Sequence, residues 1–300
     1  MSDVDVPDRF HVVANFGASV AVRPLDGDDR APVLQAVPLR TLPLLVAGDR
    51  VRCEAEAGGS LRATELLTRE SVLERPDHRG RPKPLAANLT HLGIVSAAPP
   101  GIDTLLIDEF CVGAHRAGIE AIIVINKADL LDAPARAAVR AVLDVYASIG
   151  HPAVLIDAKS EAGIEPLERE LAGRTLVLVG ASGAGKSSIV QRLLPDREVR
   201  IGALSAATGL GAHTTSVTLR YALPRHGAVI DSPGVRRYSV AHVAPEDVRS
   251  GYREIARLGE RCRFGNCAHV VEPGCAVRAA LEAGEIAPWR YANYRKLAGL

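Results

Sequence analysis

The sequence predicts an α/β domain with a mostly parallel, doubly wound sheet, placed between a small all-β barrel and a helical C-terminal segment. Three observations in the 300 residues support this arrangement. Short alternating segments fill residues 1–70, apolar strands alternate with helical stretches from about residue 92, and helical sequence follows residue 245. We therefore expect domains at 1–70, 91–244 and 245–300, with a basic linker at 71–90.

The N-terminal segment carries short strand-like runs separated by the turn sequences DGDD, AGD and AGG. Such a pattern predicts a small closed barrel of the oligonucleotide-binding type, although an unspecialised β-domain would show it too. The stretch that follows is rich in Arg, Pro and Gly and is typical of a linker. The expected strands are 11–17, 18–24, 33–39, 49–56 and 60–67.

The central domain is predicted from the apolar runs LGIVSA, AIIVI, AVLI and TLVLV, which alternate with helical stretches at 104–118 and 134–149. Strands separated by helices of this length favour a parallel sheet. After this domain we expect a helix over 246–258, a loop rich in Cys and His, and two closing helices.

Composition limits the possible partners and compartments. Lys and Arg total 36 against 35 Asp and Glu, so only a local basic patch could bind nucleic acid. The acidic start lacks the layout of a secretory signal, and the apolar runs are too short to span a bilayer. We expect a soluble, cytoplasmic protein without membrane contact. Its five cysteines are an odd number and too sparse for a secreted disulfide framework, which would have an even and denser set.

The strongest motif, GASGAGKS, begins at Gly180 between the strand TLVLV and the helical stretch SSIVQRLL. This strand–loop–helix context is what a phosphate-binding loop requires, and it disfavours an ordinary Gly-rich turn. Backbone N–H groups converge on phosphate oxygens, Lys186 reaches the β- and γ-phosphates with a role in catalysis, and the Ser187 hydroxyl binds Mg²⁺. The expected phosphate-binding residues are Gly180, Ala181, Ser182, Gly183, Ala184, Gly185, Lys186, Ser187 and Ser188.

A second motif, Asn126-Lys127-Ala128-Asp129, follows the strand AIIVI and matches the NKxD element that reads guanine. The Asp129 carboxylate would accept from N1–H and the 2-amino group, a pattern that adenine does not offer. Lys127 would pack over the base and tie this loop to the phosphate loop. Alone, such a tetrapeptide would more often begin a helix than read a base. Ala158-Lys159 after the strand AVLI resembles the SAK loop that backs the guanine, with Asp157 in place of Ser.

These base-reading elements precede the phosphate loop, whereas in ordinary GTPases they follow it. The same sheet can form if the old termini are joined and the chain is reopened elsewhere, because termini usually lie close together at the surface. The order therefore predicts a circularly permuted P-loop GTPase domain, with its switch segments immediately before the C-terminal segment.

The switch segments are predicted after the phosphate loop. Asp231-Ser-Pro-Gly234 follows the strand GAVI, so Asp231 should hold Mg²⁺ through water and the Gly234 amide should meet the γ-phosphate. The DSPG sequence alone would more often be a plain turn. Thr214 or Thr215 should complete the Mg²⁺ shell, and the sequence does not choose between them.

Catalysis by this site lacks an obvious water-orienting side chain. Val235 follows DSPG, where many GTPases carry Gln, and valine can neither donate nor accept a hydrogen bond. Slow intrinsic hydrolysis is therefore expected, with help from another polar group or a partner. His213, beside the switch threonines, is the catalytic candidate, and a structural loop histidine is the alternative.

The C-terminal loop has the spacing Cys262-x4-Cys267-x-His269-x5-Cys275, which supplies three thiolates and one imidazole. This donor set matches a closed, tetrahedral, structural Zn²⁺ site with no position left for water. Chance clustering and a redox pair are the alternatives. The segment is therefore expected to be a helical zinc-binding domain whose metal folds the loop.

Together, NKAD, AKS, GASGAGKS, GAHTTS, DSPG and the Cys/His loop resemble, in this order, the ribosome small-subunit-dependent GTPase A family. The resemblance covers nearly the whole chain. It implies a GTPase with an N-terminal oligonucleotide-binding barrel and a C-terminal zinc domain that both contact ribosomal RNA. It further implies a late assembly factor of the small ribosomal subunit, stimulated by that subunit and released according to nucleotide state. GTP or GDP, Mg²⁺ and one structural Zn²⁺ are the expected cofactors, and the chain is expected to be a monomer.

Two other functions are compatible with the residues alone. Val235 would suit a switch or scaffold that signals by GTP occupancy with negligible hydrolysis. A P-loop ATPase or small-molecule kinase is disfavoured by the NKAD motif and by the lack of a lid-like Arg-rich segment after the phosphate loop.

Overall fold

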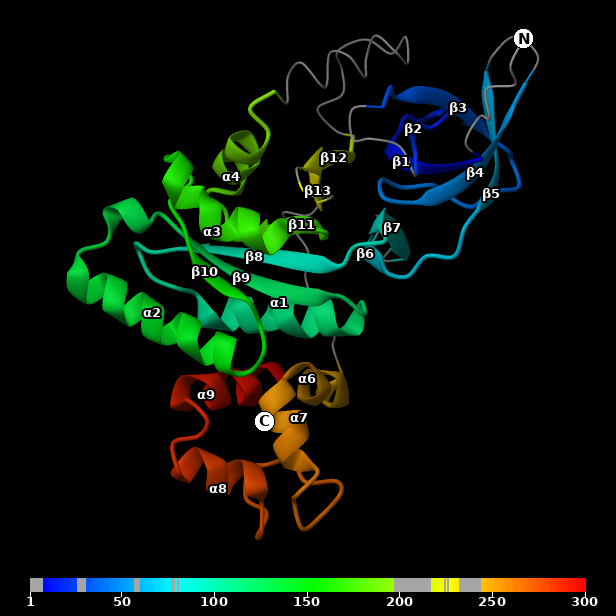
Figure 1. Cartoon of the computed structure of the whole chain (residues 1–300). Helices are drawn as coiled ribbons and strands as arrows, with labels where there is room; N and C mark the ends of the chain where they lie inside the picture. Colours follow the sequence, from blue (N-terminus) through cyan, green and yellow to red (C-terminus); the bar gives the residue numbers. More distant parts are fainter. Residues whose placement is uncertain are drawn as a thin grey trace. The chain divides into compact units, whose positions relative to one another are not determined.

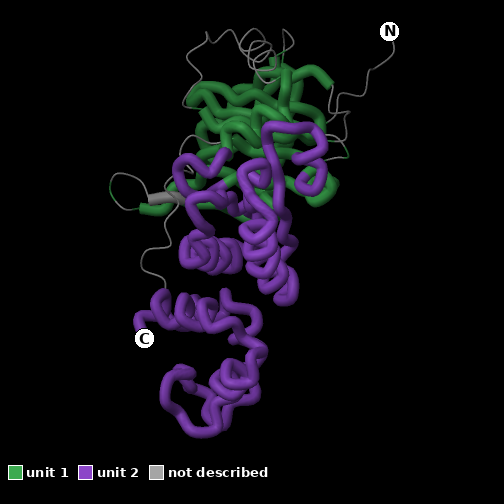
Figure 2. The backbone as a smooth tube through the Cα atoms, turned by 90° about the vertical axis from the view of Figure 1, so that its left-hand side faces the viewer, with its two compact units in different colours: residues 1–91, 168–178, 186–238 green, residues 92–167, 179–185, 239–300 purple. Residues whose placement is uncertain are grey.

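A computed structural model of the chain describes residues 8–25, 31–56, 60–76, 79, 81–196, 217–223, 225, 227–231 and 244–300. The chain forms two compact units, coloured separately in Figure 2. The first unit comprises residues 1–91, 168–178 and 186–238, and the second comprises residues 92–167, 179–185 and 239–300. Each unit therefore contains segments that are distant in the sequence.

The N-terminal part of the first unit is the closed five-stranded barrel that the sequence predicts (Figure 1). The strands pair in the order β1-β2-β3-β5-β4, and β4 closes the barrel by pairing with β1. Apolar side chains alternate inward, and Phe10, Val12, Val22 and Val51 are fully buried in its core. The strands are β1 (Arg9–Asn15), β2 (Val20–Pro24), β3 (Leu34–Pro38), β4 (Arg50–Ala55) and β5 (Leu61–Leu66).

The stretch predicted as a linker contains a β-hairpin of β6 (Val72–Pro76) and β7 (Pro82–Ala87). The hairpin is attached to the barrel loop that precedes β4. The Asn88 side chain donates to the Gly48 carbonyl at 2.9 Å, and a Cβ on Gly48 would lie 2.1 Å from the Ala87 carbonyl oxygen. The Pro-rich composition favours irregular chain, but Pro76 and Pro82 stand at strand ends. Pro84 lies inside β7 beside the register shift between Leu73 and Glu74, and a bulge tolerates proline.

Three further strands belong wholly or largely to the first unit. β11 (Thr175–Gly180) runs parallel to β13 (Gly227–Asp231), which pairs in an antiparallel manner with β12 (Leu219–Leu223). β12 in turn meets the barrel strand β1 through the pair Leu219 and Ala14. The helix α4 (Lys186–Leu193) follows the phosphate loop at the end of β11, as the sequence predicts.

The second unit contains the sheet order β10-β9-β8, made of β8 (His91–Ala97), β9 (Glu120–Asn126) and β10 (Ala153–Leu155). β9 and β10 are parallel, and residues 121–126 of β9 are all buried, as expected for a parallel strand covered on both faces. The helices α1 (Thr104–Arg116) and α2 (Ala133–Ser148) connect these strands, and α3 (Glu161–Leu171) follows β10, with residues 168–171 in the first unit. Asp103 and Asp132 cap α1 and α2 by accepting from backbone N–H groups.

Four short helices complete the second unit: α6 (Pro245–Gly251), α7 (Arg253–Gly259), α8 (Ala276–Glu282) and α9 (Pro288–Leu297). The single helix predicted over 246–258 is interrupted at Tyr252, which has φ −95° and ψ 90°. Close packing explains the break, since a Cβ on Gly251 would lie 2.8 Å from Val112 Cα and the Tyr252 ring is fully buried. No helix in the described part of the chain combines the length and apolar character of a membrane span.

A buried polar cluster joins these C-terminal helices to α1 and α2. Asp108 of α1 has no exposed surface and accepts hydrogen bonds from Tyr146, Tyr252, Arg290 and Asn293. Burial raises the pKa of Asp108, while the Arg290 guanidinium and these hydrogen bonds act in the opposite direction. The carboxylate is thus the meeting point of α1, α2, α9 and the break between α6 and α7.

Arg290 carries the positive charge of this cluster. Its Nε lies 2.7 Å from Glu254 Oε1, and its guanidinium lies 4.2 Å from the centre of the Tyr252 ring. Only 1% of the Arg290 surface is exposed. A buried guanidinium needs such partners, because an unpaired charge in the interior is strongly destabilising.

Candidate nucleotide site and metal centre

The phosphate loop has the strained backbone that its glycines allow. Gly180, Gly183 and Gly185 have φ of 130°, 76° and 95°. A Cβ on Gly180 would lie 1.9 Å from the Val95 carbonyl oxygen, and one on Gly185 would lie 2.1 Å from Asn126 Nδ2. These two positions therefore exclude any larger residue, while residues 181–183 stay exposed to solvent.

Asn126 ties together the three loops that the sequence assigns to the nucleotide. It ends β9 with only 3% of its surface exposed. Its Nδ2 donates to the Ala184 carbonyl of the phosphate loop at 3.0 Å, and its Oδ1 accepts from the backbone N–H of Ala158 at 3.2 Å. One side chain thus connects the NKAD, AKS and GASGAGKS segments within the second unit.

The rest of the NKAD segment forms a tight turn. Lys127 adopts a left-handed conformation with φ 69°, and a 3₁₀ turn follows over Ala128–Leu130. The backbone N–H of Ala128 donates to the Ile156 carbonyl at 3.0 Å, and Arg136 donates to the Ala128 carbonyl at 2.7 Å. The tetrapeptide thus leads into a single 3₁₀ turn, and the α-helix α2 begins only after Asp132. The role of Asp129 in reading a base stays a prediction.

The Asp129 carboxylate is paired with the second base-site loop. Lys159 Nζ lies 2.7 Å from Asp129 Oδ2, and this hydrogen bond raises the pKa of Lys159. The Asp157 side chain contacts its own loop, where its Oδ1 accepts from the backbone N–H of Lys159 at 2.8 Å. Sequence reasoning did not foresee the ion pair, because residues 129 and 159 lie in different motifs.

The predicted switch residues are described only in part. Asp231 ends β13, half-buried, opposite Leu219 of β12, which matches the predicted strand before DSPG. His213, Thr214, Thr215 and Gly234 lie outside the described residues. Their roles therefore stay predictions.

The four predicted metal ligands come together. One donor atom from each of Cys262, Cys267, His269 and Cys275 lies within 4.8 Å of the others. The Sγ atoms of Cys262 and Cys275 are 3.9 Å apart, and His269 Nδ1 is 3.6 and 3.5 Å from them. A tetrahedral zinc with Zn–S bonds of about 2.3 Å would place two thiolates about 3.8 Å apart. All three cysteines are free, so the geometry fits a metal rather than a disulfide.

The loop that carries these ligands is organised by Glu272. Its carboxylate accepts from the backbone N–H groups of Ala268, Val270 and Val271 at 2.7, 2.9 and 3.0 Å. These hydrogen bonds, chiefly that of Ala268, lower the pKa of Glu272 to about 2. The backbone at His269 is held by Tyr291, whose hydroxyl donates to the His269 carbonyl oxygen at 2.6 Å.

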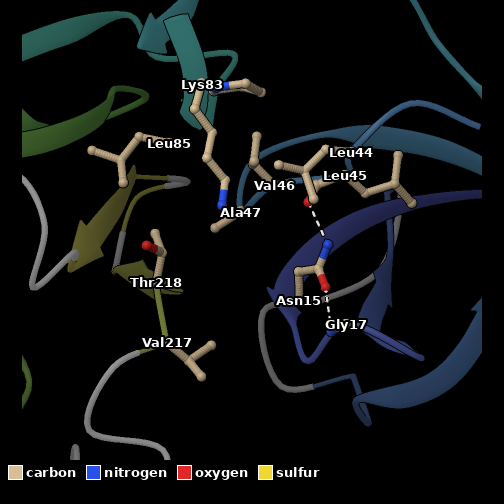
Figure 3. Close-up of a pocket in the computed structure, with 11 residues that line it drawn as sticks. Asn15, Gly17, Leu44, Leu45, Val46, Ala47, Lys83, Leu85, Val217 and Thr218 are labelled. Carbon is tan, nitrogen blue, oxygen red and sulfur yellow. Dashed lines mark hydrogen bonds between the residues drawn. The ribbon is translucent and has the colours of Figure 1, made fainter. Parts of the chain in front are cut away.

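A separate pocket of about 300 Å³ lies in the first unit, between the barrel loop 44–47, the hairpin strand β7 and the start of β12 (Figure 3). Its walls are mostly apolar, and Lys83 points its side chain toward them. The Asn15 side chain in this wall is already engaged, with Leu45 as acceptor and Gly17 as donor. None of the residues predicted to bind the nucleotide or the metal lines this pocket.

Comparison with known proteins gives one consistent family. The sequence model described as RsgA GTPase matches residues 66–241. A curated relative from Ectopseudomonas mendocina, named small ribosomal subunit biogenesis GTPase RsgA, is 42% identical over 286 residues, which is 95% of this chain and 83% of that protein.

Two solved structures share the fold. The crystal structure of YjeQ from Thermotoga maritima aligns with a TM-score of 0.79 and 29% identity, covering 98% of each chain. The crystal structure of YloQ, described as a circularly permuted GTPase, aligns with a TM-score of 0.80 and 23% identity, covering 100% of this chain and 96% of that one. The second likeness concerns the fold alone, and it agrees with the permuted order of the motifs.

Proposed function

Because the chain belongs to the RsgA GTPase family, we propose that it hydrolyses GTP while it takes part in the assembly of the small ribosomal subunit. The observation that carries this proposal is the bridge made by Asn126. Its side chain hydrogen-bonds to Ala158 and to Ala184, so it links the NKAD segment, the AKS segment and the phosphate loop, although these segments run in permuted order.

In the proposed mechanism, guanine is read by the Asp129 carboxylate, with Lys127 and Lys159 beside the base. The backbone N–H groups of the phosphate loop bind phosphate oxygens at the start of α4, where the helix dipole favours negative charge. Lys186 would reach the β- and γ-phosphates and stabilise the charge that develops during transfer. No protein nucleophile is required, because water attacks the γ-phosphate.

Mg²⁺ would be held by oxygen donors. Ser187 follows Lys186 at the first turn of α4, and Asp231 stands at the end of the neighbouring strand β13. We assign the metal to these two residues together with Thr214 or Thr215, while His213 is the candidate to orient the attacking water. Gly234 would meet the γ-phosphate and report its loss.

We assign one structural Zn²⁺ to Cys262, Cys267, His269 and Cys275. The donor set and the distances between donor atoms suit a closed four-coordinate site, and three of the four ligands are buried. Bound zinc would stabilise the loop between α7 and α8. It would have no role in GTP hydrolysis, because no coordination position is left for a substrate.

The barrel offers a surface for ribosomal RNA. His11 lies directly opposite Arg23 on β2 and Arg50 on β4. Burial, followed by the charges of Arg220, Arg50 and Arg23, lowers the pKa of His11 to about 3. His11 is therefore neutral, and Arg23 and Arg50 stand on the two strands that pair with β1 beside it. Arg50 is paired with Glu70 at 2.7 Å, and phosphate groups of RNA would be attracted to this group of arginines.

The proposed partner also bears on where the protein acts, on its oligomeric state and on its release. We propose that it acts in the cytoplasm, where small subunits are assembled, and as a monomer, because one chain supplies every assigned nucleotide ligand. Release from the subunit would follow GTP hydrolysis through the switch residues.

The test is steady-state hydrolysis of GTP and ATP with and without purified small subunits, and with large subunits as the control. Stimulation of GTP turnover by small subunits alone is the expected result. The variant Asp129→Asn should prefer xanthosine over guanosine nucleotides, because an amide donates to the xanthine C2 carbonyl. GTP binding with flat turnover under every condition would contradict hydrolysis and favour an occupancy switch.

A further inference from the structure

The carboxylate predicted to read guanine has a single hydrogen-bond partner within the described residues. This partner is the Lys159 ammonium, 2.7 Å from Asp129 Oδ2. The Lys159 side chain is 71% exposed, whereas that of Asp129 is 25% exposed. Holding this long, exposed lysine beside Asp129 costs side-chain conformational entropy. The energy of an exposed ion pair rarely compensates for such a cost, which suggests that the pair has another role.

Recognition of guanine requires this carboxylate to be held in one orientation. Both oxygens must face donors of the base at once, so a freely rotating carboxylate would lose affinity on being ordered. Residue 157 could supply a donor if it were serine. Asp157 cannot, because an ionised carboxylate only accepts, and its Oδ1 is taken by the backbone N–H of Lys159 at 2.8 Å.

The backbone around Lys159 is fixed, so its side chain starts from a defined place. The N–H of Ala158 is bound to Asn126 Oδ1 at 3.2 Å, and the N–H of Asp157 donates to the Gly163 carbonyl at 3.1 Å. A Cβ on Gly163 would lie 2.4 Å from the Asp157 carbonyl oxygen, which keeps this loop closely packed. The loop therefore holds the ammonium group beside Asp129 before any base arrives.

We infer that Lys159 is a positioning residue that orients the Asp129 carboxylate for guanine, in place of a hydroxyl at residue 157. This inference rests on the proposed function, in which Asp129 reads the base. Because Lys159 acts through Asp129, it should matter only while residue 129 is a carboxylate. A lysine that merely packed over the base plane would contribute equally whatever stands at 129.

The experiment is a fluorescence titration of the full-length protein with a fluorescent GDP analogue, followed by competition with unlabelled GDP. Lys159→Met should raise the Kd for GDP by about tenfold, the loss of one charge-assisted hydrogen bond of about 1.4 kcal/mol. Lys159→Arg should restore most of the affinity, since its guanidinium can donate to the same oxygen. Lys296→Met, the same change at an exposed position of α9, serves as the control and should leave the Kd unchanged.

The decisive comparison uses Asp129→Asn with xanthosine diphosphate. In that background Lys159→Met should change the Kd by less than about twofold, because the lysine no longer has a carboxylate to orient. An equal loss in both backgrounds would overturn the inference, and so would an unchanged GDP affinity in the single variant. Failure of the proposed function would look different: Asp129→Asn alone would then leave the preference for guanine intact.

Discussion

Replacing Asn126 should disconnect the three nucleotide loops. In Asn126→Ala, the Ala184 carbonyl and the Ala158 N–H both lose their partner at a position where the native side chain is only 3% exposed. Each unsatisfied buried group costs about 1–3 kcal/mol, and partial entry of water lowers the sum. We expect a loss of about 3 kcal/mol in the free energy of unfolding of this unit.

Asn126→Asp separates the two contacts, because it keeps the shape of the side chain. One carboxylate oxygen can still accept from Ala158, but the other faces the Ala184 carbonyl where Nδ2 stood at 3.0 Å. Burial and this repulsion should raise the pKa of the new carboxyl in the folded state. The folded protein then binds a proton more tightly than the unfolded chain, so the destabilisation grows as pH rises and shrinks as pH falls toward 5.

The assay combines thermal unfolding at several pH values with GDP titration at neutral pH. Both Asn126 variants should bind GDP at least about tenfold more weakly, because the loops must be ordered during binding. Gln191→Glu, the same amide-to-acid change at an exposed position of α4, is the control. Native GDP affinity in Asn126→Asp, with a melting temperature that depends on pH just as that of the native protein does, would refute the bridging role.

Three further perturbations follow from the described contacts. Cys267→Ala should abolish bound zinc measured by elemental analysis, whereas Cys53→Ala in the barrel should keep one zinc per chain; full zinc in the first variant contradicts the assigned ligands. Arg290→Met leaves two buried carboxylates without their cation and should cost about 3–5 kcal/mol in urea unfolding, partly recovered by adding Asp108→Asn. A loss under about 1 kcal/mol would show that the cluster adds little. Burial, followed by the charges of Arg253 and Arg290, lowers the pKa of His151 to about 4. Below about pH 6.5 the unfolded chain therefore binds a proton at His151 that the folded protein does not bind, so the free energy of unfolding falls from pH 6.5 toward 4. His151→Phe should flatten this part of the melting profile, and an unchanged slope would assign the pH dependence to other groups.

Prediction from sequence succeeded where a structural element is specified by neighbouring residues. The barrel strands, the apolar strand β9 and the glycines of the phosphate loop follow from alternation, from continuous apolar runs and from positive-φ turns. It was less accurate where packing overrides local preference. The residues 246–258 have a helical pattern, but the buried ring of Tyr252 and the contact of Gly251 with Val112 divide them into two helices.

The β6–β7 hairpin illustrates a second limit. Its residues are rich in Pro and Arg, which locally favours irregular chain, and its pairing becomes stable where Asn88 and Ala87 bind the barrel loop. A hairpin of two strands is marginal alone, so its presence depends on that attachment. The composition of the segment could not reveal the attachment.

Short stretches of sequence were enough to predict the chemistry: a guanine-reading motif, a phosphate loop and a four-ligand metal loop, each contained in at most 14 consecutive residues. Only the folded chain shows which side chains meet across long stretches of sequence. Asn126 meets Ala184 across 58 residues, and Asp108 meets Arg290 across 182. Contacts over such separations depend on how the whole chain folds. Motifs are recognised from the spacing of neighbouring residues, and that spacing does not specify which distant residues meet.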